Sequence, residues 1–227
     1  MGGKMFSTDF FYCNQGSREE QLDRYIAVET GCCRVFMLAD GYSSCSEQPH
    51  YVDWMMEQLS LLKGSKINCE DICDEIVRLL QRTDGYPGKA SLAFVVSDAE
   101  HYRYTTLGDT RIYWLAENIR TEDHSIAQLA VESGRCIAEK IRFHPYRNKL
   151  TRHAGQGLKY LPVWDSKPVC NNECLLLCSD GFWSLLDDKD IFRITGNADL
   201  TLLLDQVMIT PLADNLSVVL LRPASAT

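Results

Sequence analysis

Four aspartates lie at the ends of apolar segments, where they could bind metal ions. Three apolar runs lead into Asp40, Asp109 and Asp180, and Asp214 precedes a fourth run. Paired strands can bring such carboxylates to one edge of a sheet, where they repel one another unless they are spread apart, protonated or neutralised by a cation. Oxygen ligands without His or Cys favour hard ions such as Mg²⁺ or Mn²⁺ over Zn²⁺. Because Asp is also common in turns, these aspartates alone leave the function open.

Other catalytic signatures do not accompany these aspartates. The sequence contains no GxSxG, HExxH or GxGxxG pattern, and Gly88-Lys89 lacks the rest of a phosphate-binding loop. Its five histidines are scattered without ligand spacing, and its ten cysteines include no CxxC pair of the kind that binds zinc. We interpret the cysteines as small apolar side chains, and Cys178 as part of a buried strand.

The composition is that of a globular protein with an acidic surface. The chain has 227 residues, 45% of them hydrophobic, and its 23 Lys and Arg against 31 Asp and Glu give a net charge of −8. These values exclude wholesale disorder, and the negative charge argues against nucleic-acid or anionic-membrane partners. No apolar run is long enough to cross a membrane, and no apolar signal segment follows Met1. We therefore expect one domain over residues 1–227, located in the cytoplasm.

Hydrophobic periodicity predicts eight strands and four helices. The strands are expected at 6–13, 24–28, 33–38, 90–97, 101–107, 111–115, 174–178 and 216–221. Apolar stripes with helical spacing predict helices over 52–62 and 72–80, and two more are expected at 125–133, with Ser125 as N-cap, and at 200–208. Strands in blocks with hairpin-length gaps favour antiparallel sheets with helices packed outside, an α+β fold.

Six short motifs follow one another along the chain. They are Asp40-Gly41, Gly108-Asp109-Thr110-Arg111, Thr121-Glu122-Asp123-His124-Ser125, Asn148-Lys149-Leu150-Thr151-Arg152, Leu177-Cys178-Ser179-Asp180-Gly181 and Asp214-Asn215-Leu216-Ser217. In this order the series resembles the type-2C metal-dependent serine/threonine protein phosphatases, especially their compact single-domain bacterial members, from about Gly16 to Leu221. The resemblance implies a central sandwich of two antiparallel β-sheets flanked by helix pairs, with metal ions at one end.

The same resemblance implies the metal ligands. Asp40 matches the carboxylate that bridges two ions, and Gly41 matches the residue whose carbonyl binds the second ion. Asp180 and Asp214 match the other ligands of the first ion, and Asp109 matches a weaker third position shared with Asp180. The ions are expected to be Mn²⁺ or Mg²⁺.

Two further residues match catalytic positions of the family. Asp23 matches the acidic residue that orients a metal-bound water, and Arg18 matches the arginine that binds the phosphate. The implied activity is hydrolysis of phosphoserine or phosphothreonine in proteins by a water that bridges two metal ions, which suits a pair of cations and an Arg fork. The implied partners are a phosphorylated protein and a serine/threonine kinase, and we expect a monomer.

The chain departs from the family pattern at several positions. Ser43-Ser44 replaces a glycine pair, Leu22 stands where many members carry Glu or Gln, and Lys89-Ala90-Ser91 replaces a Gly-Thr-Thr-like stretch. No histidine follows Asp40-Gly41 as a general acid, and for His124 and His144 we favour a structural role. The alternative is a weakly active or inactive relative that binds phosphoproteins, and a small-molecule phosphatase is a third hypothesis. The chain retains every implied metal ligand, which argues against an inactive relative.

Overall fold

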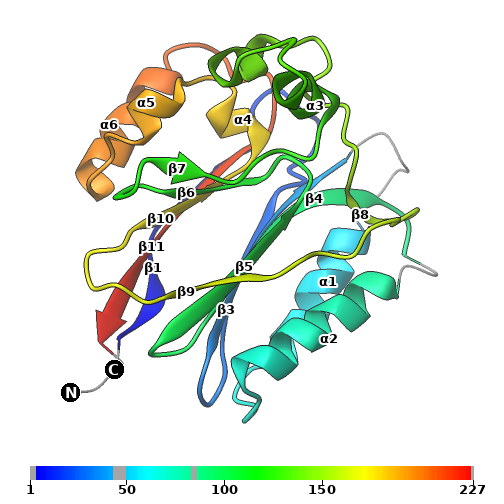
Figure 1. Cartoon of the computed structure of the whole chain (residues 1–227), viewed down its shortest axis with the longest axis vertical. Helices are drawn as coiled ribbons and strands as arrows, with labels where there is room; N and C mark the ends of the chain where they lie inside the picture. The colour runs from blue at the N-terminus through cyan, green and yellow to red at the C-terminus, as the bar shows by residue number, and fades with distance from the viewer. Residues whose placement is uncertain (1–3, 43–49, 83–85, 226–227) are drawn as a thin grey trace.

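The computed structural model describes residues 4–42, 50–82 and 86–225. Two β-sheets pack face to face, and helices cover the outer face of each sheet (Figure 1). Every strand pair is antiparallel. The predicted α+β sandwich of two antiparallel sheets is therefore confirmed.

The first sheet joins the two ends of the described chain to its middle. Its order is β1-β11-β10-β6-β7. The strands are β1 (Lys4–Asn14), β11 (Leu216–Ser225), β10 (Leu175–Cys178), β6 (Arg111–Trp114) and β7 (Ile119–Arg120). Because β10 and β11 lie side by side, the residues just after β10 and just before β11 share one end of this sheet.

The second sheet has the order β2-β3-β4-β5-β9, with β8 paired to β4. Its strands are β2 (Arg24–Glu29), β3 (Arg34–Gly41), β4 (Lys89–Ser97), β5 (His101–Leu107), β8 (Ala154–Gly155) and β9 (Asp165–Pro168). The end of β3 carries Asp40, and the turn after β5 carries Asp109.

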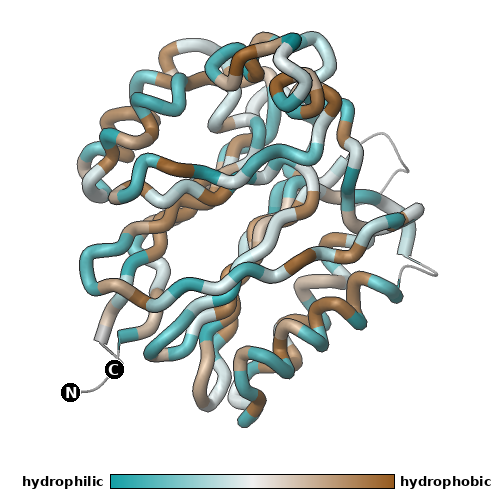
Figure 2. The backbone as a smooth tube through the Cα atoms, viewed as in Figure 1, coloured by the Kyte–Doolittle hydropathy of each residue, from teal (hydrophilic) through white to brown (hydrophobic). Residues whose placement is uncertain are grey.

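The helices lie in two groups. The second sheet is covered by α1 (His50–Ser60) and α2 (Cys69–Gln81) (Figure 1). The first sheet is covered by α3 (Ile126–Glu132), α4 (Asp180–Trp183), α5 (Asp188–Ile191), α6 (Asn197–Val207) and the 3₁₀-helix η1 (Ala138–Phe143). Hydrophobic and hydrophilic residues alternate along α1 and α2 (Figure 2), as expected for helices with one face against a sheet.

Three apolar clusters hold these layers together. The central cluster contains buried residues from both sheets, among them Phe36 and Val95 of the second sheet and Leu177 and Val219 of the first. The other two clusters lie between each sheet and its own helices. Burial of this apolar surface stabilises the sandwich and fixes the relative positions of the strand ends.

The structure contains all eight predicted strands and all four predicted helices, with shifted ends. Ser125 is the N-cap of α3, and its side chain accepts a hydrogen bond from the Gln128 N–H. The short elements β7, β8, β9, α4, α5 and η1 were not predicted. No helix in the described part of the chain is long and apolar enough to cross a membrane.

Candidate active site

Asp40 and Asp109 are held at one end of the second sheet through Ser91. Asp40 is the penultimate residue of β3 and pairs with Ser91 of β4. The Ser91 Oγ accepts hydrogen bonds from the backbone N–H groups of Asp109 and Thr110, at 2.8 and 2.6 Å. Gly108 has a φ of +102°, and a Cβ there would lie 2.5 Å from the Ser91 Oγ. Glycine at 108 therefore allows the turn that carries Asp109 to approach β4.

Asp180 begins α4, directly after β10. A Cβ on Gly181 would lie 1.8 Å from the backbone oxygen of Asn215, so only glycine lets this first helical turn lie against the start of β11. The indole Nε1 of Trp183 donates a hydrogen bond to the backbone oxygen of Asp109, at 2.8 Å. These contacts place Asp180 between the Asp109 turn and the turn that carries Asp214.

Asn215 fixes the segment between β1 and β2, which carries Arg18 and Asp23. Its Nδ2 donates to the backbone oxygens of Gln15 and Glu20, at 2.8 and 2.9 Å. Its Oδ1 accepts a hydrogen bond from the Leu22 N–H at 2.8 Å. Both N–H groups of the Asn215 side-chain amide and one lone pair of its oxygen thus hold the loop beside Asp214.

Asp23 is a buried carboxyl group, 2% exposed. Its Oδ2 accepts a hydrogen bond from the Ser179 Oγ at 2.8 Å, and the Ser179 Oγ accepts one from the Ser217 N–H at 3.0 Å. Among the described residues, the Asp23 Oδ1 has no hydrogen-bond partner. Burial raises the pKa of Asp23 to about 7, although the hydrogen bond from Ser179 opposes the shift.

The predicted ligand carboxylates influence one another electrostatically. Burial raises the pKa of Asp40 well above its ordinary value, and the charges of Asp23, Asp180, Asp109 and Asp214 raise it further. Burial and the charge of Asp180 likewise raise the pKa of Asp109. The tertiary structure thus gathers the predicted acidic residues from distant parts of the sequence into one acidic cluster at one end of the sandwich.

Two arginines pair with members of this cluster. Arg18 donates from Nε and Nη2 to the two carboxylate oxygens of Asp214, at 2.7 Å each. Arg147 donates from Nη1 to Asp180 Oδ2 at 2.8 Å, and its charge opposes the increase that burial causes in the pKa of Asp180. The pair of Arg18 with Asp214 lies near the surface, whereas Asp180 is mostly buried.

The chemistry of the donor set fits a hard divalent cation. The acidic cluster offers only oxygen ligands, and burial together with the neighbouring carboxylates raises the pKa of Asp40 and of Asp109. In the side-chain conformations of the described residues, however, no three His, Cys, Asp or Glu side chains form a group that could hold a metal ion. Arg18 and Arg147 each bind a carboxylate oxygen of a predicted ligand, Asp214 and Asp180 respectively.

Other motif residues build the frame around the cluster. Arg111 and Asp123 form a buried bidentate ion pair with both distances at 2.7 Å, and the Arg111 guanidinium lies 3.4 Å from the centre of the Trp183 ring. The His124 Nδ1 accepts a hydrogen bond from the Gly108 N–H at 3.1 Å, and burial lowers the pKa of His124. The favoured structural role for His124 agrees with this bond, which supports the Asp109 turn.

Arg147, Asn215, Ser179 and Ser91 are contact residues that were not predicted from the sequence. Asn215 and Ser179 stand inside quoted motifs, beside Asp214 and Asp180, so their position was a usable signal. Nothing in the pattern around Arg147 predicts its contact with Asp180. Ser43-Ser44 lies outside the described residues, and Leu22 is buried with its backbone N–H bound to Asn215.

Comparisons with known proteins identify relatives of the chain. No family model matches it. It is 23% identical over 145 residues to the protein phosphatase PhpP of Streptococcus pneumoniae, an alignment covering 62% of this chain and 59% of PhpP. It is 31% identical over 91 residues to the serine/threonine phosphatase Stp of Listeria innocua, covering 39% of this chain and 36% of Stp. The alignments thus span less than two thirds of either curated relative.

Solved structures extend the likeness over the whole fold. The chain superposes on the serine/threonine phosphatase PstP/Ppp of Mycobacterium tuberculosis with a TM-score of 0.77 at 20% identity, covering 96% of this chain and 98% of that one. The catalytic domain of PstP in complex with two manganese ions gives a TM-score of 0.73 at 18% identity, covering 97% of this chain and 99% of that one. The related sequences, the shared fold and the ordered motifs together support a member of the type-2C phosphatase family.

Proposed function

We propose that this chain is a metal-dependent phosphatase that hydrolyses phosphoserine and phosphothreonine in proteins. The observation that carries the proposal is the acidic cluster of Asp40, Asp109, Asp180 and Asp214 at one end of the sandwich. The charges of the other three raise the pKa of Asp40. A phosphate ester is itself negative, so such a cluster suits it only when cations are bound. The two manganese ions of PstP are consistent with this requirement.

The proposed ligands are those that the family resemblance implies. Asp40 and the Gly41 carbonyl, with Asp180 and Asp214, would hold two ions, Mn²⁺ or Mg²⁺, and Asp109 with Asp180 a third. When bound, the cations would lower the pKa of a water molecule poised to attack phosphorus and would neutralise charge on the phosphate.

The chain's own residues bind the phosphate and move the proton. Arg18 is exposed beside Asp214, and its planar guanidinium can hold two phosphate oxygens once it leaves that carboxylate. The Asp23 Oδ1 is unpartnered among the described residues, and its pKa of about 7 lets it accept and return a proton near neutral pH. The hydrogen bond from Ser179 fixes the orientation of this carboxyl group.

The second candidate is a phosphoprotein-binding module with little or no activity. The pairing of Arg18 with Asp214 and of Arg147 with Asp180 favours it, because both arginines compete with cations for the predicted ligands. A module of this kind would bind a phosphopeptide without hydrolysing it.

The cellular setting is part of the proposal. All nine cysteines that the structure describes are free thiols, which suits the reducing cytoplasm. We propose a phosphorylated protein as substrate and a serine/threonine kinase as the opposing partner, with residues 1–227 acting as one catalytic domain and a monomer. The central apolar cluster, which joins both sheets, supports a single folding unit.

The decisive experiment is turnover of a phosphothreonine peptide with added Mn²⁺, with chelator, and with the Asp40→Asn variant. We expect turnover only with metal and none from Asp40→Asn, because the amide cannot supply the bridging charge. Asp165→Asn, an exposed aspartate of β9, is the matched control and keeps wild-type turnover. Turnover in chelator overturns the metal mechanism, and binding of the peptide without turnover in any metal establishes the second candidate.

A further inference from the structure

A group of thiols lies at the turn between β2 and β3. Cys32 is exposed and Cys33, the residue before β3, is only 2% exposed. Cys69, the first residue of α2, is 3% exposed and lies next to Cys33 although 36 positions separate them. These cysteines were predicted only to be small apolar side chains, and their contact was not predicted.

The three sulfur atoms form a connected chain. The Cys69 Sγ donates a hydrogen bond to the Cys33 Sγ at 2.9 Å, and the Cys33 and Cys32 Sγ atoms are 3.8 Å apart. The Cys32 thiol donates to the backbone oxygen of Ile67 at 2.9 Å. Since a disulfide bond is about 2.05 Å long, the sulfurs of Cys33 and Cys69 need to approach by only about 0.9 Å.

The surroundings of this group are fixed. The Thr30 N–H and hydroxyl both donate to the backbone oxygen of Cys33, and Asn68 caps α2 through the Asp71 N–H. The hydrogen bond from Cys69 lowers the pKa of the Cys33 thiol, whereas the same bond raises that of Cys69, and the charge of Asp98 opposes ionisation of all three thiols. Cys33 is buried from solvent but is thus prepared to attack an oxidised sulfur at Cys32, the exposed thiol.

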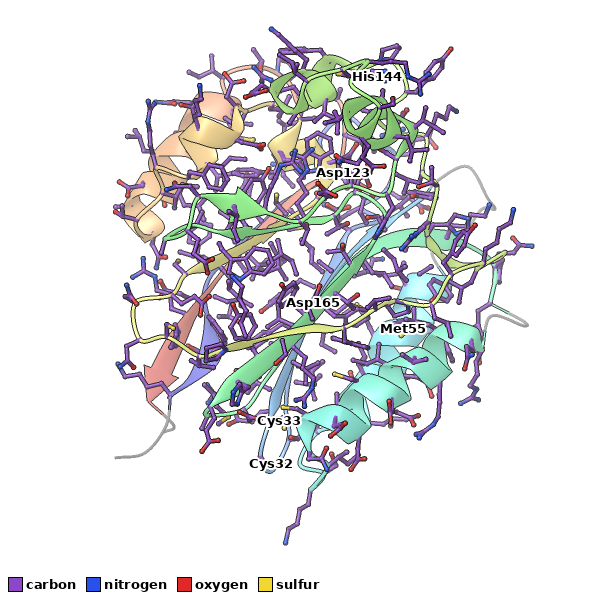
Figure 3. All side chains as sticks on the ribbon, in the orientation of Figure 1. Cys32, Cys33, Met55, Asp123, His144 and Asp165 are labelled. Carbon is purple, nitrogen blue, oxygen red and sulfur yellow. The ribbon has the colours of Figure 1, made fainter. Side chains whose placement is uncertain are left out.

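The thiol group lies far from the acidic cluster. Figure 3 shows Cys32 and Cys33 at one end of the molecule and Asp123 toward the other. Cys33 precedes β3, whereas Asp40 lies seven residues further along the chain, at the other end of β3. A strand of this length places the two residues on the order of 20 Å apart. The thiols are therefore not part of the proposed phosphatase centre.

We propose that Cys32, Cys33 and Cys69 form a redox modification site, in which exposed Cys32 reacts with a peroxide and a disulfide between Cys33 and Cys69 is the stable product. The inference is independent of the proposed function, because it uses none of the residues assigned to the acidic cluster.

The reaction balances in three steps. The Cys32 sulfur attacks one oxygen of hydrogen peroxide, the O–O bond breaks, and water leaves while Cys32 becomes a sulfenic acid. The Cys33 sulfur then attacks the Cys32 sulfur, the S–O bond breaks, and a second water leaves. Finally, the Cys69 sulfur attacks the Cys33 sulfur and Cys32 departs as a thiol with the proton from Cys69. In total, one peroxide is reduced to two waters and two thiols are oxidised to one disulfide.

The product would tie the β2–β3 turn to the start of α2. Such a link restrains the unfolded chain across the segment between Cys33 and Cys69, so it stabilises the fold. We expect the oxidised protein to melt about 5–10 °C higher than the reduced protein.

The test treats the full chain with a few equivalents of hydrogen peroxide in a Cys45→Ser background, since Cys45 lies outside the described residues. Thiol counting, peptide mapping by mass spectrometry and thermal melts follow the reaction. We expect loss of two thiols per chain, a crosslinked peptide that joins Cys33 to Cys69, and full reversal by dithiothreitol. Absence of that crosslink, or oxidation of Cys32 alone, overturns the proposal.

Variants separate the roles of the three thiols. Cys32→Ser should slow crosslinking about tenfold or more without changing its product, because the reactive entry point is lost. Cys69→Ala should abolish the crosslink and the rise in melting temperature. Cys73→Ala, which removes a buried thiol one turn further along α2, and Cys170→Ser, which removes an exposed thiol elsewhere, are the controls and should crosslink at the wild-type rate. Equal crosslinking rates for Cys32→Ser and wild type refute the relay.

Discussion

Arg18 and Asp214 form a bidentate ion pair across 196 positions of sequence, with both N–O distances at 2.7 Å. The two residues were predicted to serve different ligands, the phosphate and a metal ion. In the structure the Arg18 guanidinium and the Asp214 carboxylate bind each other instead. If Asp214 binds a cation as proposed, the cation competes with Arg18 for the same carboxylate, and a displaced Arg18 could bind phosphate.

This pairing predicts opposite effects of Arg18→Ala on metal and substrate. The variant should bind Mn²⁺ more tightly, by up to about fivefold, because the exposed pair no longer competes for Asp214. Its KM for a phosphothreonine peptide should rise about tenfold or more, because a charged contact to phosphate is lost. Titration calorimetry with Mn²⁺ and steady-state kinetics measure the two effects. Arg34→Ala, which breaks an ion pair with Glu29, is the control. Unchanged values of both constants would contradict the assignment.

Asp109 and Gly108 should respond differently to mutation. The Asp109 turn is held through backbone atoms, by Ser91 and Trp183, so Asp109→Ala should leave the melting temperature in chelator unchanged or higher. Its kcat should fall at least about tenfold if the carboxylate is a ligand. Gly108→Ala should lower the melting temperature, because its φ is +102° and the added Cβ meets Ser91. Stability loss in Asp109→Ala with normal kcat would make Asp109 only a turn residue.

The raised pKa of Asp23 predicts that the metal-free protein loses stability as pH rises. Its folded pKa of about 7 exceeds the ordinary value of 3.8, so the folded state holds a proton that the unfolded state releases. The stability that this proton provides is complete below about pH 4 and is lost as pH rises through 7. Between pH 5.5 and 8 the free energy of unfolding should fall by about 2 kcal/mol from this group. Urea unfolding in chelator measures it. In Asp23→Asn the decrease should be smaller by that amount, and an identical slope would be incompatible with a protonated Asp23.

The buried pair of Arg111 and Asp123 predicts a large asymmetry between single and double variants. Arg111→Met removes the bidentate partner of the Asp123 carboxylate, which is 4% exposed and keeps only Arg120 at 4.0 Å, and should cost about 3–5 kcal/mol of unfolding free energy. Replacing both residues by Met and Leu should restore much of this loss. Arg78→Met, which breaks an exposed pair with Glu75, should cost less than about 1 kcal/mol. Urea unfolding of the four proteins checks the series, and equal losses in the two arginine variants would refute it.

Apolar periodicity in the sequence was enough to predict the long elements and an α+β fold, whereas the two-sheet sandwich was implied by the family resemblance. The helix from Cys69 to Gln81 buries Ile72, Ile76 and Leu80 because their spacing places them on one helical face, a property that local sequence contains. By contrast, β9 consists of Asp165–Pro168, which has no apolar alternation, and it exists because the edge of β5 offers backbone partners. Pairing of that kind depends on where the rest of the chain has folded.

The same division applies to the site. Order and residue type pointed to Asp40, Asp109, Asp180 and Asp214, because each aspartate follows or precedes an apolar run and its motif is local. By contrast, the contacts of Arg18 with Asp214, of Arg147 with Asp180 and of Cys33 with Cys69 are visible only once the chain has folded. These contacts join residues 33 to 196 positions apart. Their geometry follows from the packing of two sheets and their helices, which no short stretch of sequence specifies.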